Sequence, residues 1–330
     1  MKKKVTVVIP NYNGMKYLKT CLDALARQVM TDFDTIVVDN ASADESCVFI
    51  KEQYPWVKLI ELDKNTGFSG GVNVGIKAAK TPYVILLNND TEVEREFVLE
   101  LVEIMDSDSR IFSASSKMIQ YHNRQLLDDA GDLYTILGWG IQRGVGQSSA
   151  SYTIQTSVFS ACAGAAIYRR AVFKEIGLFD RRHFAYLEDI DVGYRARIAG
   201  YRNVYCPKAR VYHVGSGTSG SKYNSFKVRL AARNSVYLNY KNMPVFQLAV
   251  NMPFLVLGYA LKWSFFKKNG FANEYVGGIR EGIRTCRKCR KVKFEKKNLK
   301  NYFSIQLQLM INMVIYAMEF GKRRLGQLKR

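Results

Sequence analysis

Three neighbouring polar residues follow a strongly apolar run and could bind a charged ligand. Asn88, Asn89 and Asp90 come directly after residues 84–87, a run typical of a strand that is buried on both faces. A carboxylate in such surroundings needs a partner. Because Mg²⁺ is often held by one or two carboxylates together with phosphate oxygens, Asp90 is a candidate metal ligand. The alternative is that Asp90 caps a following helix, since acidic residues come next.

A second acidic group contains three carboxylates in four positions. Glu188, Asp189 and Asp191 stand near the expected start of a helix, where acids are favourable in any case. Their crowding is not explained by that role, because like charges at short range raise one another's pKa and create a proton acceptor. Such a base could take the proton from a hydroxyl group.

Polar or turn-forming residues also follow the other expected strands, namely Pro10, Asn11, Asn13, Asp39, Asn40, Asn65 and Gly67. In parallel α/β sheets ligands bind beyond the carboxyl ends of the strands, so we expect these residues to share one rim. For Asp39 the functional interpretation is hydrogen bonding to a nucleotide base and ribose, and the alternative is a turn and helix cap.

His213 follows another expected strand and precedes the Gly- and Ser-rich run of residues 215–220, which predicts a mobile loop. A single histidine usually has a structural role. At a strand end beside such a loop it is also a candidate for contact with a metal or a phosphate.

Four rounds of strand and helix must position these groups. The expected strands cover residues 5–9, 35–38, 57–62 and 83–87, and the expected helices cover 16–28, 45–53, 71–79 and 94–105. Residues 106–157 predict only loops with short strands. Regular structure resumes over 159–169, in a helix over 188–199 and in a strand over 204–212. This order predicts an α/β fold whose mostly parallel sheet is flanked by helices.

The charge of the chain is unevenly distributed. The net charge is +20, but residues 1–220 carry +1 and residues 221–330 carry +19, with 23 Lys and Arg against 4 Asp and Glu. This asymmetry predicts a catalytic domain over 1–220 and a basic, mainly helical extension over 221–330.

The extension combines this charge with apolar segments. Residues 243–266 are mostly apolar but are interrupted by Gln247, Asn251 and Lys262. This favours a segment in the membrane interface, and the alternatives are a spanning helix and a buried helix. A second apolar stripe consists of Phe303, Leu307, Met310, Ile311, Val314 and Met318. Residues 280–300 are densely basic and suit anionic lipid headgroups. An anionic membrane surface is therefore the expected partner, ahead of a solvated basic face or a nucleic acid.

Two further features set the expected compartment. The six cysteines mostly lie in apolar runs, and the Cys286/Cys289 pair lacks the second pair that a structural zinc site requires. The apolar stretch at the N-terminus is too short for a signal peptide and breaks at Pro10. We expect a protein at the cytoplasmic face of the cell membrane, bound peripherally or with one inserted segment.

Five ordered motifs resemble the inverting glycosyltransferases of family 2, which share the GT-A fold. They are VTVVIPNYNG (5–14), DTIVVDNASAD (34–44), LLNNDTE (86–92), FDRRHFAYLEDIDVGYRARIAGYR (179–202) and VYHVGSGTSG (211–220). They are spread over a stretch of about 210 residues. The resemblance implies a nucleotide-diphosphate sugar as donor and a glycan, or a glycan linked to polyprenyl diphosphate, as acceptor.

The resemblance also implies roles for single residues. Asp189 would be the catalytic base with Glu188 beside it, Asp39 would recognise the base, and Asp90 with His213 would hold Mn²⁺ or Mg²⁺. The implied donor site contains Pro10, Asn11, Asn13, Asp39, Asn40, Asn65, Gly67, Gly71, Asn73 and Asn89, and the implied acceptor or diphosphate contacts are Asp191, Arg195 and Thr218. Many relatives have Asp where this chain has Asn88, so Asp90 lacks a flanking carboxylate.

Residues 65–76 and the Asn-rich metal motif look most like rhamnosyltransferases that use dTDP-rhamnose in surface polysaccharide synthesis. The alternatives are a UDP-hexose or UDP-galactofuranose donor, a sugar nucleotidyltransferase, and a non-catalytic protein that binds nucleotide sugars. A nicotinamide-dependent enzyme is disfavoured, because the first strand leads into residues 10–14 and not into a G-x-G-x-x-G loop.

Overall fold

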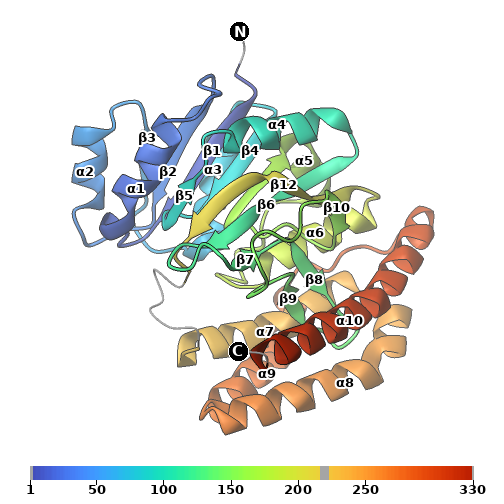
Figure 1. Ribbon diagram of the computed structural model, residues 1–330. Helices are drawn as coiled ribbons and strands as arrows, with labels where there is room; N and C mark the ends of the chain where they lie inside the picture. Colours follow the sequence, from blue (N-terminus) through green and yellow to red (C-terminus); the bar gives the residue numbers. More distant parts are fainter. Residues whose placement is uncertain (1–2, 216–222, 329–330) are drawn as a thin grey trace.

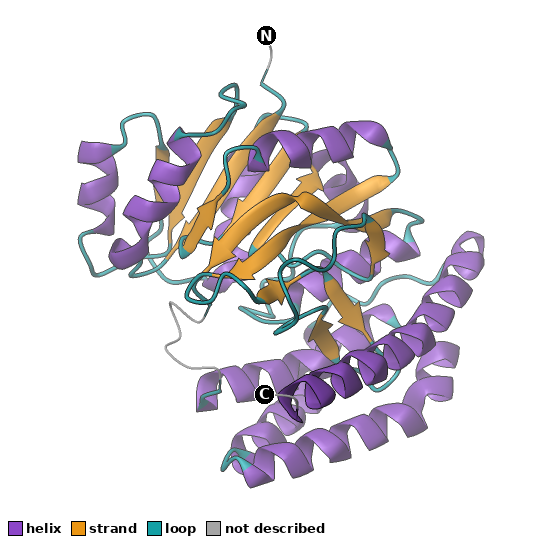
Figure 2. Ribbon diagram, in the orientation of Figure 1, coloured by secondary structure: helices purple, strands orange, loops and turns teal. Residues whose placement is uncertain are grey.

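Figure 1 shows the computed structural model of the protein, which describes residues 3–215 and 223–328. Within these residues the strands form a ten-stranded sheet and a separate two-stranded hairpin, β8-β9. The main path through the sheet has the order β10-β12-β6-β11-β4-β1-β2-β3, and β5 and β7 pair at its side. Helices cover the sheet, and α7 to α10 gather together below it in the view of Figure 2.

The strands of the main sheet are β1 (Val5–Asn11), β2 (Asp34–Asp39), β3 (Lys58–Glu61), β4 (Tyr83–Leu87), β5 (Thr91–Val93), β6 (Ile111–Gln120), β7 (Leu127–Asp129), β10 (Thr156–Val158), β11 (Ala165–Arg169) and β12 (Arg202–His213). The hairpin consists of β8 (Asp132–Tyr134) and β9 (Gly140–Gln142). The helices are α1 (Met15–Ala26), α2 (Ser46–Gln53), α3 (Gly67–Ala78), α4 (Phe97–Ser107), α5 (Phe173–Ile176), α6 (Glu188–Ile198), α7 (Ser225–Asn242), α8 (Val245–Lys268), α9 (Ala272–Thr285) and α10 (Leu299–Leu328).

The first four expected strands are confirmed, and they pair in parallel in the order β4-β1-β2-β3. Successive residues of β1 enter different cores: Val7 packs in the cluster that includes α1 and α4, and Val8 packs in the one that includes α3 and α6. This explains the continuous apolar run, since both faces of the strand are buried. The register pairs Asn11 with Asp39, so the carboxyl ends of β1 and β2 are level.

We expected only loops and short strands in residues 106–157, and this prediction was wrong for the first part of that segment. Strand β6 is ten residues long and lies inside the sheet between β11 and β12. Its middle, Ser113 to Lys117, is polar but buried, and Ser113 and Ser116 satisfy their hydroxyls on Asn203 and on the carbonyl of Ala165. Serine lowers the apolar signal of a strand, which is why periodicity did not reveal it.

The C-terminal helices share a core with the rest of the chain. Tyr134 of β8, Ile190 of α6, Leu238 of α7, Leu255 of α8 and Leu309 of α10 belong to one buried apolar cluster. The polar groups of this region are paired as well, since the Tyr134 hydroxyl lies 2.5 Å from the side-chain oxygen of Asn239. Helices α7, α8 and α10 therefore cover the end of α6 and the β8-β9 hairpin.

Helix α8 has its polar side chains inside and its apolar side chains outside. Gln247 and Asn251 are buried and both donate to the Gln306 side chain of α10, at 3.0 and 2.9 Å. The residues that interrupt the apolar run in the sequence therefore face the protein. The exposed large apolar side chains of α8 are Val245, Phe246, Val250, Met252, Phe254, Val256, Leu257, Leu261, Trp263 and Phe265.

Helix α10 has the same arrangement. Asn312 is fully buried and donates to the main-chain oxygen of Tyr134, at 2.9 Å. Its exposed apolar side chains include Phe303, Leu307, Met310, Ile311, Val314 and Met318, the stripe expected from the sequence. By length and composition alone, the segments Val245–Lys268 and Lys296–Gly321 in the described part of the chain are long and apolar enough to cross a membrane.

Two adjacent glycines of α9 test how α7 and α9 pack. A Cβ at Gly278 would stand 2.3 Å from the main-chain oxygen of Arg229 in α7, whereas a Cβ at Gly277 would meet nothing within 4 Å. We expect Gly278→Ala to lower the free energy of unfolding by about 1–3 kcal/mol, because backbone must shift. Gly277→Ala should raise it by about 0.5–1 kcal/mol through helix propensity. Urea unfolding of both variants measures this, and shifts of the same sign would contradict the packing.

Candidate active site

Asn11, at the end of β1, hydrogen-bonds to the ends of both neighbouring strands. Its side-chain amide donates to Asp39 of β2 at 2.8 Å, and its side-chain oxygen accepts from the amide of Asn89 after β4 at 2.7 Å. All three residues are buried. Asp39 also accepts from the main-chain nitrogen and the hydroxyl of Ser42, at 2.9 and 2.6 Å. Since α2 begins at Ser46, Asp39 holds a turn and does not cap that helix.

Asn40 connects this row to the start of α3. Its side-chain nitrogen donates to the oxygen of Gly67, and its side-chain oxygen accepts from the main chain and the hydroxyl of Thr66. Asn65 accepts from the nitrogen of Gly67 at 2.8 Å, and Gly67 has a φ of +72°, which glycine adopts without strain. A Cβ at Gly71 would come 2.7 Å from Asn40 and 3.6 Å from Pro10, so glycine permits this close approach.

Asn13 lies at the solvent edge of the same rim. Its side-chain oxygen accepts from the nitrogen of Ala43 at 2.8 Å, and its own nitrogen donates to the Ser42 hydroxyl at 2.9 Å. The φ of Asn13 is +49°, a conformation that asparagine tolerates better than most residues. The residues after β1 and β2 thus form one connected wall.

Asp90 and His213 are brought together by the pairing of β5 with β12. The register places His213 opposite Thr91, and the His213 Nε2 atom lies 3.3 Å from a carboxylate oxygen of Asp90. The alternative that Asp90 caps a helix is wrong, because residues 91–93 form a strand and α4 begins only at Phe97. Asn88 also lies 3.3 Å from Nε2 through its amide nitrogen.

His213 is oriented by a residue that the sequence did not reveal. Its Nδ1 atom lies 2.7 Å from a carboxylate oxygen of Asp128 at the middle of β7. Burial by itself lowers the pKa of His213, but the hydrogen bonds to Asp128 and Asp90 outweigh it and raise the pKa to about 10. A carboxylate on one ring nitrogen is the usual support for a histidine that binds a metal through the other. Asp90 and His213 could hold a divalent cation, which would displace the proton on the Nε2 atom.

Asp189 stands in the first turn of α6, as expected. One carboxylate oxygen accepts from the nitrogen of Ile190 at 2.8 Å, and the other lies 3.4 Å from the nitrogen of Ala163. The hydroxyl of Ser160 donates to the Asp189 main-chain oxygen at 2.6 Å. Burial raises the pKa of Asp189. Burial and the Asp189 charge also raise the pKa of Glu188, whose Oε2 atom has no hydrogen-bond partner among the described residues.

Asn88, which is close to the candidate metal ligand Asp90 in the sequence, contacts the loop between β10 and β11. Asp189 contacts the same loop. Asn88 donates from its main chain to the oxygen of Gly164 at 2.8 Å, and Asp189 approaches the nitrogen of the preceding Ala163. A Cβ at Gly164 would stand 3.1 Å from the Asn88 amide. The two candidate centres thus lie on neighbouring residues of one turn.

Part of this site lies within a segment that matches a known family. Residues 6–177, just over half of the chain, match the family described as Glycosyl transferase family 2. The chain belongs to this family.

Two curated relatives show different extents of similarity to this family 2 glycosyltransferase. The N-acetylglucosaminyl-diphospho-decaprenol L-rhamnosyltransferase of Mycobacterium tuberculosis is 24% identical over 245 residues, which cover 67% of this chain and 79% of the relative. The teichoic acid poly(glycerol phosphate) polymerase of Staphylococcus epidermidis is 31% identical over 94 residues, which cover 27% of this chain. The second match spans 13% of the length of the polymerase.

Solved structures confirm the GT-A fold. Residues 1–349 of TarS from Staphylococcus aureus, in complex with UDP-GlcNAc, align with a TM-score of 0.58 and 20% identity over 92% of this chain and 90% of that chain. The mannosyltransferase PcManGT from Pyrobaculum calidifontis, with GDP-Man and Mn²⁺, aligns with a TM-score of 0.55 and 14% identity over 95% and 87%. The expected fold of this glycosyltransferase is therefore confirmed.

Asn73, expected in the donor site, bonds to the main chain of Phe179 in this glycosyltransferase. Its amide donates to the main-chain oxygen of Phe179 at 2.7 Å, and its side-chain oxygen accepts from the nitrogen of the same residue at 3.0 Å. Both polar ends are therefore occupied by the segment that leads toward α6.

Asp191 and Arg195, which we expected at the acceptor or the diphosphate, form an ion-pair network within the protein. The Asp191 carboxylate is fully buried and pairs with Arg195 at 3.0 Å and with Lys241 of α7 at 2.9 Å. The other N–H groups of the Arg195 guanidinium donate to main-chain oxygens of residues 176–178. Both side chains are therefore held by bonds within the protein. Thr218 lies outside the described residues.

Helix α7 holds the loop that leads into α6. The amide of Asn234 lies 2.9, 2.8 and 2.8 Å from the main-chain oxygens of His183, Ala185 and Tyr186. Arg233 donates to the oxygens of Arg182 and His183. Phe184, Tyr186 and Leu187 have positive φ values of 64°, 73° and 65°, and such strained residues persist only where their surroundings enforce them. The C-terminal region thus imposes the conformation directly before Glu188 and Asp189.

Replacing Asn234 should release this loop. In Asn234→Ala the main-chain oxygens of Ala185 and Tyr186 lose this donor, while that of His183 keeps only Arg233. We therefore expect trypsin to cut after the exposed Arg181 or Arg182 about tenfold faster, a change of ~1.4 kcal/mol in local opening. Limited proteolysis with mass spectrometry measures the cut. Asn301→Ala is the matched control, because Asn301 of α10 donates to one oxygen at Ile198, the far end of α6. Equal cleavage of both variants would refute the positioning role.

Proposed function

We propose that the protein is an inverting glycosyltransferase that moves a sugar from a nucleoside-diphosphate donor to a hydroxyl of a lipid-linked or polysaccharide acceptor in cell-surface glycan synthesis. The observation that carries this proposal is the approach of Asp189 and the Asp90 motif to one turn, residues 163–164. A proton acceptor and a site for a diphosphate-bound cation are the two groups that the reaction needs.

Asp189 acts as the base in this proposal. Its raised pKa makes it a better proton acceptor than an ordinary aspartate, and it takes the proton from the acceptor hydroxyl. The hydroxyl oxygen forms a bond to the anomeric carbon while the bond from that carbon to the donor diphosphate breaks, which inverts the centre. A Mn²⁺ or Mg²⁺ ion bound by Asp90 and His213 would supply positive charge for the departing diphosphate. No enzyme carboxylate serves as a nucleophile.

The wall formed by Asp39, Asn11 and Asn89 is the proposed place of the nucleotide. Asp39 is buried at the carboxyl end of β2, the edge of the sheet where ligands bind in such folds, and its carboxylate is the proposed contact for the base and the ribose. Asn13, Asn40, Asn65, Gly67, Gly71 and Pro10 shape the surrounding rim. L-Rhamnose from dTDP-rhamnose is the proposed donor, supported by the similarity to the mycobacterial L-rhamnosyltransferase. UDP-hexoses and UDP-galactofuranose are the alternative donors.

A donor screen with two acidic variants tests this proposal. We expect release of dTDP from dTDP-rhamnose by the wild type in the presence of acceptor, and a rate about 10²–10⁴-fold lower in Asp189→Asn, because the general base is lost. Glu188→Gln is the matched control from the same helix turn and should retain more activity. Nucleotide binding measured by calorimetry shows that the variants are folded. An undiminished rate in Asp189→Asn would refute the assignment of the base.

The C-terminal region is the proposed attachment to the cytoplasmic face of the cell membrane. The exposed apolar faces of α8 and α10 offer the contact, and their buried polar residues bond within the protein. One side of each helix carries polar residues that bond within the protein, and the other side is apolar and exposed. Because only one side of each helix is free to contact lipid, we place both helices in the membrane interface and not across the bilayer. Exposed basic residues flank the faces: Lys267 and Lys268 end α8, and Lys296, Lys297 and Lys300 precede or begin α10.

Each basic residue near an anionic surface contributes about 1 kcal/mol. Electrostatic attraction and burial of the apolar faces would therefore act together. A membrane location would also place the protein beside acceptors that are linked to a lipid.

Flotation with anionic liposomes tests the membrane contact in the full chain. We expect the triple variant Phe303→Glu, Leu307→Glu and Met310→Glu to float at least tenfold less than the wild type, because it places charge on the apolar face of α10. Ile154→Glu is the matched control, since Ile154 is an equally exposed apolar residue outside the C-terminal helices. Equal flotation of the triple variant and the wild type would contradict the contact.

A further inference from the structure

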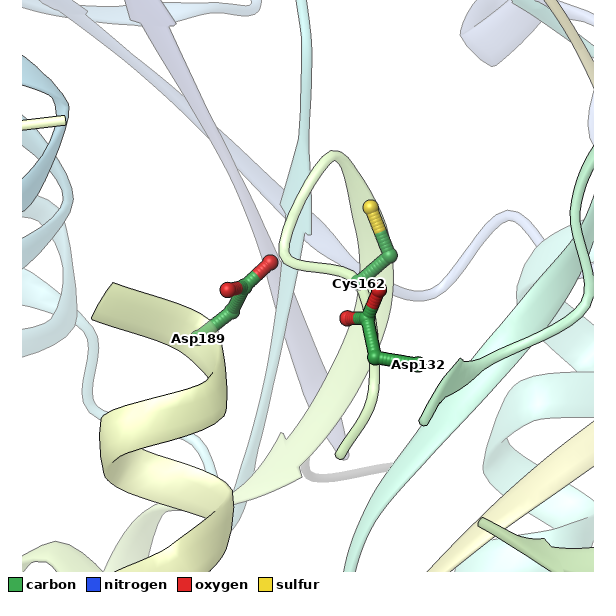
Figure 3. A group of neighbouring side chains, drawn as sticks. All are labelled: Asp132, Cys162 and Asp189. Atoms are coloured by element: carbon green, nitrogen blue, oxygen red, sulfur yellow. The ribbon is translucent and has the colours of Figure 1, made fainter. Parts of the chain in front are cut away.

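A second group of metal-ligating side chains lies beside the proposed base and apart from the Asp90–His213 pair. Asp132, Cys162 and Asp189 each offer one ligand atom, and these atoms all lie within 4.8 Å of one another. Figure 3 shows them: Asp189 comes from the first turn of α6, Asp132 from β8 and Cys162 from the loop before β11. None of the three belongs to the strand ends that form the nucleotide wall.

Asp132 is the member whose surroundings point to a missing ligand. Its side chain is 6% exposed, and its Oδ2 atom has no hydrogen-bond partner among the described residues. In Figure 3 its carboxylate is directed toward Cys162 and Asp189. A buried carboxylate oxygen without a partner costs free energy, which a bound cation would remove.

Other buried acids surround this place. Asp129 and Glu188 are buried beside it, and each also has a carboxylate oxygen without a partner in the described part of the chain. Burial, together with the neighbouring carboxylates, raises the pKa of Asp129 and of Asp132. Within the described residues no Lys or Arg forms an ion pair with Asp129, Asp132, Glu188 or Asp189. A divalent cation would supply the charge that the protein lacks here.

The donor set selects the kind of cation. Two carboxylates and a thiol suit borderline or soft ions such as Zn²⁺ and Cd²⁺, whereas Mg²⁺ and Mn²⁺ prefer oxygen ligands. Three protein ligands and one open position are typical of a zinc site that also binds water. With bonds of about 2.0–2.3 Å, a tetrahedral ion holds its ligand atoms about 3.3–3.7 Å apart, so the three side chains must draw together by about 1 Å.

We propose that Asp132, Cys162 and Asp189 form an inhibitory site for a thiophilic divalent cation such as Zn²⁺. Binding forms metal bonds to the Cys162 sulfur and to one oxygen of each aspartate, and the proton of the Cys162 thiol is released to water. Asp189 can then no longer accept a proton from the acceptor. The binding itself is independent of the proposed function, whereas the inhibition rests on it, because it assumes that Asp189 is the base.

Cd²⁺ titration of the full-length protein tests the binding. Cadmium–thiolate bonds absorb in the ultraviolet. The ultraviolet absorbance of the wild type should therefore rise as Cd²⁺ is added and then reach a plateau. We expect Cys162→Ser to lose the part of this absorption that comes from the bond between Cd²⁺ and Cys162. We expect Asp132→Asn to weaken Cd²⁺ binding about tenfold or more, on the scale of removing a group that supports a metal ion. Cys47→Ser is the matched control, since Cys47 is also half-buried, and burial and the charge of Asp39 raise its pKa. An unchanged titration in Cys162→Ser would overturn the site.

Inhibition is measured separately, with the donor that supports transfer and with saturating Mn²⁺. We expect Zn²⁺ to inhibit the wild type and the concentration for half inhibition to rise about tenfold or more in Cys162→Ser. Cadmium binding without zinc inhibition of an active wild type would overturn the inhibitory role. If no donor supports transfer, the proposed function fails while the Cd²⁺ titration still decides whether the site exists.

Discussion

The buried carboxylate of Asp191 links the candidate active site to the C-terminal region. It lies between Arg195 of its own helix and Lys241 of α7, and Asn242 donates a further hydrogen bond at 2.9 Å. Burial alone would raise the pKa of Asp191, but the charges of Lys241 and Arg195 outweigh burial and lower it far below its usual range. Removing one partner of such a buried group costs about 3–5 kcal/mol. The first turn of α6, which carries Asp189, therefore stays aligned only while α7 is in place.

Much of the proposed nucleotide-binding half could be predicted from the sequence, because its signals are local. Strands β1 to β4 are short apolar runs that are each followed by polar residues, and parallel pairing brings those ends to one edge. Asn11, Asp39 and Asn89 are connected for this reason. The pairing of β5 with β12, which joins Asp90 to His213, depends on contacts across more than 100 residues and leaves no local pattern.

The residues that sequence analysis missed lie where periodicity failed. Asp128 and Asp132 belong to short strands in residues 106–157, and the buried serines of β6 concealed the sheet around them. Asn73, Asp191 and Arg195 are a different case. Their residue types suit a ligand site, but their hydrogen bonds are used by the protein itself. Only the three-dimensional contacts distinguish a polar side chain that can still hydrogen-bond to a ligand from one whose hydrogen bonds are already formed within the protein.

The hydrogen bonds from Asn234 to the main chain of residues 183–186 limit recombination between relatives. A chimera that exchanged residues 221–330 with those of another family member would also exchange the donor that maintains three main-chain carbonyls before α6. The strained residues Phe184, Tyr186 and Leu187 would then lose the contacts that compensate for their backbone conformation. Residues 221–330 and the loop at 182–187 should therefore be inherited as a pair, even though Asn234 lies 48 to 51 residues from the loop residues that it bonds.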